Sequence, residues 1–155
     1  MFITFLIDVM KQNQDNDAII WADTTIKYRR ILEKYNFWID NFKKNKIKKG
    51  SVVIVEADFS PSSISLLIAL IDCGCIFVPI TESVAKKKEE FIRISQGEFL
   101  IKFDKNDNAN IEILSQKANH KIYNELRKEG HPGLVLFSSG STGESKASVH
   151  DVTGI

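Results

Sequence analysis

The stretch Leu134-Val-Leu-Phe-Ser-Ser-Gly-Ser-Thr-Gly-Glu-Ser-Lys146 decides both the fold and the function that the sequence predicts. Its first four residues, Leu134 to Phe137, are continuously apolar and predict a short buried strand. The residues that follow, up to Lys146, are mainly glycine, serine and threonine. Backbone amides in such a turn can point at phosphate oxygens, and small side chains let an anion approach closely. Lys146 adds a positive charge on a flexible stem. The stretch therefore predicts a loop that follows a strand and binds nucleotide phosphates.

The loop departs from the Walker A pattern G-x-x-x-x-G-K-[ST] at two positions. Counted from Gly140, Lys146 has the correct spacing. However, Ser145 stands where the second glycine belongs, and Ala147 stands where the magnesium-binding hydroxyl belongs. Both departures argue against a P-loop NTPase or kinase. A solvated serine–glycine turn between two elements is the simplest alternative to a phosphate loop.

The same residues resemble the phosphate-loop signature of adenylate-forming enzymes, [ST]-S-G-[ST]-T-G-x-P-K-G. This superfamily includes acyl-CoA synthetases, adenylation domains of nonribosomal peptide synthetases, and luciferases. Ser145 replaces the proline of the signature and Ala147 replaces its last glycine. If that glycine has a positive φ, Ala147 is strained by roughly 1 kcal/mol. The matching residues, which the resemblance assigns to the binding of ATP phosphates, are Ser138, Ser139, Gly140, Ser141, Thr142, Gly143 and Lys146.

Two upstream segments extend the resemblance to about residues 24 to 155. Ile26-Lys-Tyr28 resembles the family's L-T-Y segment, and Leu66 to Pro79 resembles its A-x-L-K-A-G-A-x-Y-V-P segment. The family's two-step reaction is thereby implied. A carboxylate attacks the α-phosphate of Mg-ATP, and a thiol or another nucleophile then takes the acyl group. The loop and Lys146 are implied to hold the β- and γ-phosphates and to stabilise the departing pyrophosphate electrostatically.

The resemblance implies that the chain is one α/β unit over residues 1–155, the N-terminal part of a larger AMP-forming acid ligase. The family's remaining functional motifs would follow Ile155, so this part alone is expected to be inactive. The parent would use ATP with Mg²⁺, a carboxylic acid, and CoA or a carrier-protein thiol. No residue here is assigned as catalytic or as a metal ligand. A non-catalytic binding or regulatory module of the same fold is the alternative.

Composition excludes several classes of protein. A length of 155 residues, 43% of them hydrophobic and 26% charged, is ordinary for a soluble globular domain. A net charge of +1 gives no reason to expect nucleic acid or a membrane surface as the main partner. The apolar start, Met1 to Ile7, lacks a basic region and ends at Asp8, so it predicts neither a signal peptide nor a membrane span. We therefore expect a cytoplasmic protein.

Strands that alternate with helices predict an α/β fold with a mostly parallel sheet. Four continuous apolar runs are expected to form that sheet; they are Val52–Val55, Ile76–Val78, Leu100–Phe103 and Leu134–Phe137. Further strands are expected over residues 18–22, 24–27 and 111–114, and helices over residues 2–10, 28–44, 61–72 and 84–95. Residues 123–126 are expected to lie in a short helix that ends near Gly130.

Two of these helices carry more detailed expectations. The helix over residues 61–72 is expected to start at Ser60 as N-cap and to end at Gly74. Because it is apolar almost all round, we expect it to be nearly enclosed. In the first helix, Phe2, Phe5, Leu6 and Val9 have the spacing of one apolar stripe.

Overall fold

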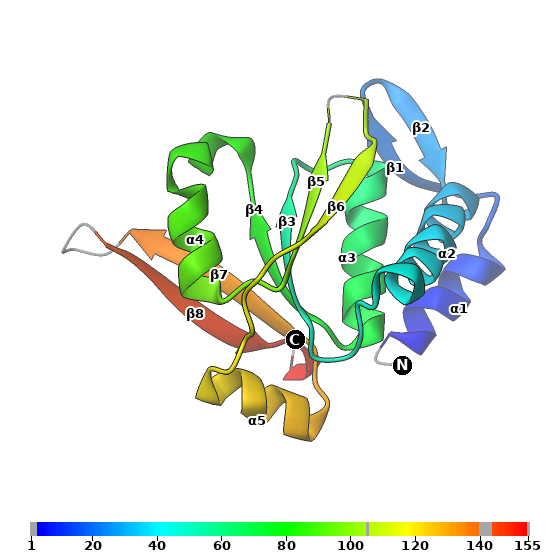
Figure 1. Ribbon diagram of the computed structural model, residues 1–155. Helices are drawn as coiled ribbons and strands as arrows, with labels where there is room; N and C mark the ends of the chain where they lie inside the picture. Colours follow the sequence, from blue (N-terminus) through cyan, green and yellow to red (C-terminus); the bar gives the residue numbers. More distant parts are fainter. Residues whose placement is uncertain (1–2, 105, 140–143, 155) are drawn as a thin grey trace.

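The computed structural model describes residues 3–104, 106–139 and 144–154, in which helices alternate with the strands of two sheets (Figure 1). The smaller sheet is the antiparallel hairpin of β1 (Asp17–Trp21) and β2 (Thr24–Lys27). The larger sheet has six strands in the order β6-β5-β3-β4-β7-β8. They are β3 (Val52–Glu56), β4 (Ile76–Ile80), β5 (Phe99–Phe103), β6 (Ala109–Ile113), β7 (Gly133–Ser139) and β8 (Ser145–Asp151).

The four apolar runs lie side by side in the larger sheet. β3 pairs in parallel with β4 and with β5, and β4 pairs in parallel with β7. The predicted α/β fold with a mostly parallel sheet is therefore confirmed. Both edge strands, β6 and β8, run antiparallel to their neighbours. Strand β8 is not predicted by its sequence, because Ser-Lys-Ala-Ser-Val-His-Asp has no continuous apolar run.

Helices cover both faces of the larger sheet (Figure 1). On one face lie α1 (Thr4–Gln12), α2 (Tyr28–Asn45) and α3 (Pro61–Cys73), and on the other lie α4 (Lys88–Ser95) and α5 (Lys121–Glu129). Side chains of β3 alternate between the two resulting cores, which is why its sequence is apolar from Val52 to Val55. Val53 and Val55 belong to the cluster under α2 and α3, and Val52 and Ile54 to the cluster under α4 and α5.

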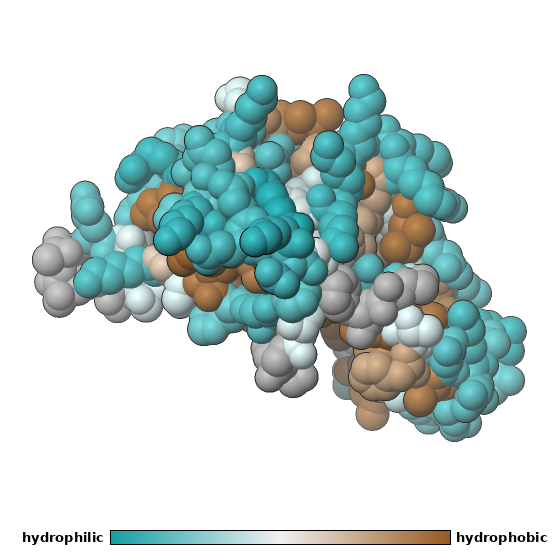
Figure 2. All heavy atoms as spheres, turned by 90° about the horizontal axis from the view of Figure 1, so that it is seen from below, coloured by the Kyte–Doolittle hydropathy of each residue, from teal (hydrophilic) through white to brown (hydrophobic). Residues whose placement is uncertain are grey.

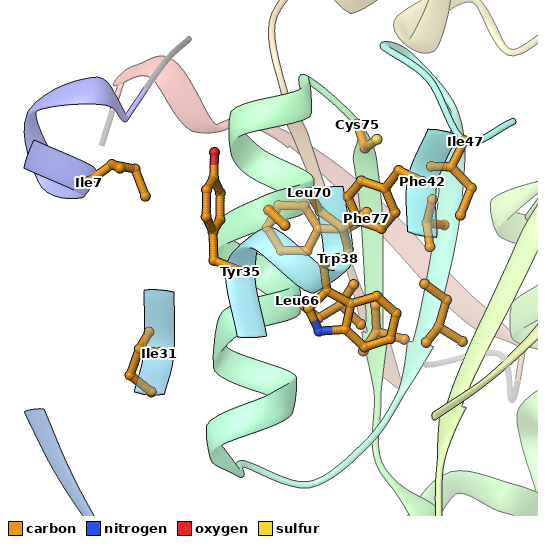
Figure 3. Close-up of a cluster of buried hydrophobic side chains, with 14 of the residues drawn as sticks. Ile7, Ile31, Tyr35, Trp38, Phe42, Ile47, Leu66, Leu70, Cys75 and Phe77 are labelled. Atoms are coloured by element: carbon orange, nitrogen blue, oxygen red, sulfur yellow. The ribbon is translucent and has the colours of Figure 1, made fainter. Parts of the chain in front are cut away.

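Trp38 of α2 is the largest fully buried side chain in the first cluster, at 2% exposure. Its indole lies beside Leu66 of α3, with Leu70 and Phe77 close by (Figure 3). The indole Nε1 donates a hydrogen bond to the carbonyl of Ser62 over 3.3 Å, so its polar atom is satisfied inside the core. This contact ties α2 to the first turn of α3.

Both predicted ends of α3 are confirmed. The Ser60 hydroxyl accepts a hydrogen bond from the amide of Ser63, and Ser63 in turn accepts from the amide of Ser60. Gly74 ends the helix with a φ of 73°, which glycine adopts without strain.

No residue of α3 is exposed, as the prediction of a nearly enclosed helix requires, but burial differs between its two flanks. Leu66 and Leu70 face α2 and the sheet and are fully buried, whereas Ile64, Leu67 and Ile71 are only half-buried. Because α2 packs against one flank of α3, the opposite flank retains a stripe of partly exposed aliphatic side chains.

The apolar stripe predicted for the first helix is wrong for Phe5 and Val9, whereas Leu6 packs against the core and Phe2 lies outside the described residues. In α1 the buried residues are Ile7 and Met10, which face α2, while Phe5 is 71% exposed and Val9 is exposed as well. The spacing of apolar residues on α1 fits two faces, and only packing selects one of them. The surface seen from below is mostly hydrophilic, with apolar atoms gathered on the right, in the region of α1 (Figure 2).

The helix expected over residues 84–95 is divided in two. A 3-10 helix, η1 (Glu82–Lys87), precedes α4, and Val84 within it has non-helical angles. A second short 3-10 turn, η2 (Val152–Gly154), follows β8. Within the described residues, no helix is both long and apolar enough to cross a membrane.

Candidate phosphate-binding site

The predicted phosphate loop joins β7 to β8. β7 enters the sheet beside β4, where Gly133 and Leu134 pair with Ile76 and Phe77. It then pairs along its whole length with β8, and the two strands extend to the left in Figure 1. The loop thus follows the carboxyl end of a strand of the parallel sheet, the edge at which ligands bind in α/β folds.

The structure brings two of the predicted site residues together. Ser138 of β7 and Lys146 of β8 are direct cross-strand partners, and both are exposed. Directly opposite residues of an antiparallel pair project from the same face, so the hydroxyl and the ammonium group lie on one side of the hairpin. The last pair before the loop joins Ser139 to Ser145, and Glu144 is an exposed bend. The predicted residues Gly140, Ser141, Thr142 and Gly143 lie outside the described part of the chain.

The residue before Lys146 faces the other side of the hairpin. Ser145 is 8% exposed, and its amide donates a 2.8 Å hydrogen bond to Oε1 of Glu90 in α4. The Lys87 ammonium group donates to the Ser145 hydroxyl over 3.3 Å. Two hydrogen bonds from Ser145 hold the pKa of Glu90 below its ordinary value. The one from the backbone amide has the larger effect, and the one from the side chain has the smaller. The exit of the loop is therefore attached to η1 and α4.

The entrance of the loop is attached to the same helix. The ring of Phe137, one residue before Ser138, stacks on the ring of Phe91 in α4, with centroids 3.9 Å apart and planes 7° apart. Both side chains belong to the cluster under α4 and α5. α4 therefore contacts both strands immediately beside the loop.

Sequence reasoning missed the contribution of Lys87 and Glu90. Both belong to a charged run that has the pattern of a solvated helix face. They lie 58 and 55 residues before Ser145, and no motif links positions so far apart. The break between η1 and α4 places Lys87 at the N-cap of α4, and no local signal in the sequence marks this break.

Ala147 fits the strand without strain. It pairs with Phe137 in the regular register of β7 and β8, and it is not one of the residues with positive φ. The conditional penalty of roughly 1 kcal/mol considered for this position therefore does not arise.

The chain after the loop also argues against a P-loop NTPase. That motif consists of a strand, the loop and a helix, and the helix N-terminus contributes to phosphate binding. Here residues Ser145–Asp151 form a strand instead. Neither the sequence of the loop nor the element that follows it matches that class.

A second charged group lies at the carboxyl end of β3. The side chain of Glu56 is 7% exposed and forms ion pairs with Lys88 and, over 3.0 Å, with Lys102. Burial raises the pKa of Glu56, but the hydrogen bonds from Lys88 and Lys102 outweigh it, and the pKa lies below its ordinary value. Glu56 is thus held as a carboxylate. Among the described residues, no group of three or more His, Cys, Asp or Glu side chains could hold a metal ion.

Comparison with solved structures settles the fold. The N-terminal subdomain of NpsA from Klebsiella oxytoca, solved in complex with 3-hydroxyanthranilyl-AMSN, superimposes with a TM-score of 0.70 at 20% identity, over 96% of this chain and 41% of that one. An artificial fusion of NpsA with ThdA is described as an adenylation–PCP di-domain and gives a TM-score of 0.71. The fold is that of the N-terminal subdomain of an adenylation domain.

Sequence relatives agree with this adenylation-domain fold. Bacitracin synthase 3 of Bacillus licheniformis is 22% identical over 155 residues, and a hydroxamate-type ferrichrome siderophore peptide synthetase of Schizosaccharomyces pombe is 26% identical over 159 residues. The alignments cover 91% and 93% of this chain but only 2% and 3% of those proteins. No model of a protein family matches the chain. The predicted resemblance to adenylate-forming enzymes is therefore confirmed, with relatives of the nonribosomal peptide synthetase type.

Proposed function

We propose that this chain supplies the phosphate-binding hairpin of an ATP-dependent, AMP-forming acid ligase. The observation that carries the proposal is the pairing of Ser138 with Lys146 at the base of a loop that matches the adenylation signature, on a sheet with the adenylation-domain fold. A hydroxyl and an ammonium group on one face of the hairpin suit the oxygens of a polyphosphate.

In the proposed reaction a substrate carboxylate attacks the α-phosphorus of ATP. A bond forms between the carboxylate oxygen and phosphorus, the bond to the bridging oxygen breaks, and pyrophosphate leaves with the electron pair. The charge that develops on pyrophosphate would be stabilised by the Lys146 ammonium group and the Ser138 hydroxyl. The work of this hairpin is to position and neutralise the leaving group.

The second substrate and the acceptor are proposed at the level of class. The relatives are peptide synthetases, and one solved relative is an adenylation–PCP di-domain. We therefore favour an amino acid or an aryl carboxylic acid as the substrate. For the acceptor of the acyl group, we favour a carrier-protein thiol over CoA. Mg²⁺ is proposed to enter as the complex with ATP, bound through the phosphate oxygens.

Titration of the 155-residue chain with pyrophosphate and with Mg-ATP, by calorimetry or NMR, tests the proposal. We expect weak binding, with a dissociation constant of about 1 mM, that weakens further as salt rises because the attraction is electrostatic. Lys146→Ala should weaken binding severalfold. Lys128→Ala, which removes an exposed lysine from α5, is the matched control and should leave binding unchanged.

Three results would contradict this function. Tight Mg-ATP binding that is insensitive to Lys146→Ala would show that the nucleotide binds elsewhere. Robust carboxylate-dependent exchange of pyrophosphate into ATP by these 155 residues would show that the chain contains the acyl site that we place in the parent enzyme. Absence of any pyrophosphate binding would favour the alternative, a non-catalytic module of the same fold.

A further inference from the structure

One departure from the adenylation signature has a structural consequence. The signature has proline where this chain has Ser145, and proline carries no amide hydrogen. The Ser145 amide donates its hydrogen to the Glu90 carboxylate over 2.8 Å. This contact exists only because the proline is missing. The loss of a rigid residue at the exit of the loop therefore coincides with a hydrogen bond that attaches the exit to α4.

The environment of Ser145 satisfies its polar groups. Its hydroxyl is nearly enclosed and accepts a hydrogen bond from Lys87 over 3.3 Å. A buried hydroxyl without a partner is costly, and a carboxylate beside an anion-binding loop would repel the ligand if its charge were not balanced. The positive charges of Lys87 and Arg93 provide that balance for Glu90, and they do not depend on the Ser145 amide.

Consecutive residues of α4 contact the two strands of the hairpin. Glu90 accepts from Ser145 in β8, and Phe91 stacks on Phe137 in β7. A predicted phosphate ligand directly follows each of the two strand residues that α4 contacts. Ser138 follows Phe137, and Lys146 follows Ser145. Because Glu90 and Phe91 belong to one helix, both strands of the hairpin are attached to a single element right beside these two ligands.

We propose that Glu90 is a positioning residue for the phosphate loop and that its hydrogen bond to the Ser145 amide replaces the constraint of the missing proline. The inference rests on the proposed function for its effect on pyrophosphate. The contact itself can be tested without any ligand.

The first test is a double-mutant cycle on pyrophosphate affinity. We expect Glu90→Ala to weaken pyrophosphate binding about fivefold, which is the effect of losing one charge-assisted hydrogen bond. Ser145→Pro restores the ring constraint and should preserve binding. In the Ser145→Pro background, Glu90→Ala should have no further effect, because the donor is already absent. Glu89→Ala, which alters the exposed neighbouring carboxylate, is the matched control and should leave binding unchanged.

The second test follows the Ser145 amide by NMR in the absence of ligand. In the unmodified chain its chemical shift should titrate at acidic pH with the lowered pKa of Glu90. Glu90→Gln keeps an acceptor oxygen, so the variant should fold and its Ser145 amide should stay protected from hydrogen exchange. The acid titration of the amide chemical shift should disappear. This variant also covers the case in which Glu90→Ala does not fold.

These experiments separate two kinds of failure. If the unmodified chain does not bind pyrophosphate, the proposed function is contradicted, whatever the amide does. If pyrophosphate binds and Glu90→Ala weakens it equally in the Ser145 and Ser145→Pro backgrounds, Glu90 acts by another route and the positioning role is overturned. An amide shift of Ser145 that does not respond to Glu90→Gln would overturn it as well.

Discussion

At the scale of single residues, Glu56 shows how burial and charge compete. Its carboxylate lies at the carboxyl end of the central strand, where water is largely excluded, yet it remains ionised because Lys88 and Lys102 contact it. Lys88 is mostly covered, whereas the Lys102 side chain is 54% exposed. The more enclosed lysine is screened less by solvent and contributes more to the stability of the pair.

We therefore expect Lys88→Ala to destabilise the protein by about 1–2 kcal/mol, since Lys102 still balances part of the charge. Lys102→Ala should cost clearly less, as expected for an ion pair whose lysine is exposed to solvent. Chemical denaturation of both variants measures the difference. An equal or larger loss for Lys102→Ala would show that burial does not decide the contribution of each pair.

Glu56 also predicts a dependence of stability on acid. Its pKa is lower in the folded chain than the ordinary value of 4.5. The stabilisation is therefore fully present above pH about 4.5 and is lost as pH falls through the lower, folded-state pKa. Glu56→Gln removes this titration, so its free energy of unfolding should fall less steeply below pH 4.5 than that of the unmodified chain. Parallel acid profiles would contradict this assignment.

At the scale of elements, α3 separates what periodicity reveals from what packing decides. Its caps were predictable because Ser60, Pro61 and Gly74 act on the backbone beside them. The face of α3 that is buried could not be predicted, because aliphatic residues occur almost all round the helix. The position of α2 determines that Leu66 is fully enclosed and Leu67 is not.

This difference yields a paired prediction. Leu66→Ala should cost about 2–5 kcal/mol, the range for a leucine deleted from a closed core. Leu67→Ala should cost clearly less, about 1 kcal/mol, because part of its surface already faces water. The two midpoints of urea unfolding can be compared directly. Equal losses would indicate that the exposed flank of α3 is covered in solution.

At the scale of the whole molecule, one sheet joins two cores. β3 and β4 send alternate side chains into the cluster under α2 and α3 and into the cluster under α4 and α5. Because the two clusters share these strands, unfolding of the strands in one cluster would expose the side chains of the other cluster to water. The chain should therefore unfold as one cooperative unit, as small single domains usually do.

Tryptophan fluorescence tests this cooperativity, because Trp38 lies in the first cluster. In a Trp21→Phe variant the remaining tryptophan reports on the first cluster, while far-ultraviolet circular dichroism reports on the whole chain. We expect the two urea transitions to coincide. A fluorescence midpoint clearly below that of dichroism would mean that the layer of α1 and α2 separates first.

The sequence by itself determined the features that depend on neighbouring residues. Continuous apolar runs identified the four parallel strands, and cap residues located the ends of α3. The glycine–serine loop before Lys146 predicted a phosphate site of the adenylation type, which stays a prediction. Tertiary structure alone decided that β8 returns beside β7, that α1 exposes Phe5, and that Glu90 holds the amide of Ser145. The physical reason is that propensity and apolarity act within a few residues, whereas contacts across 55 residues depend on how helices and sheet pack together.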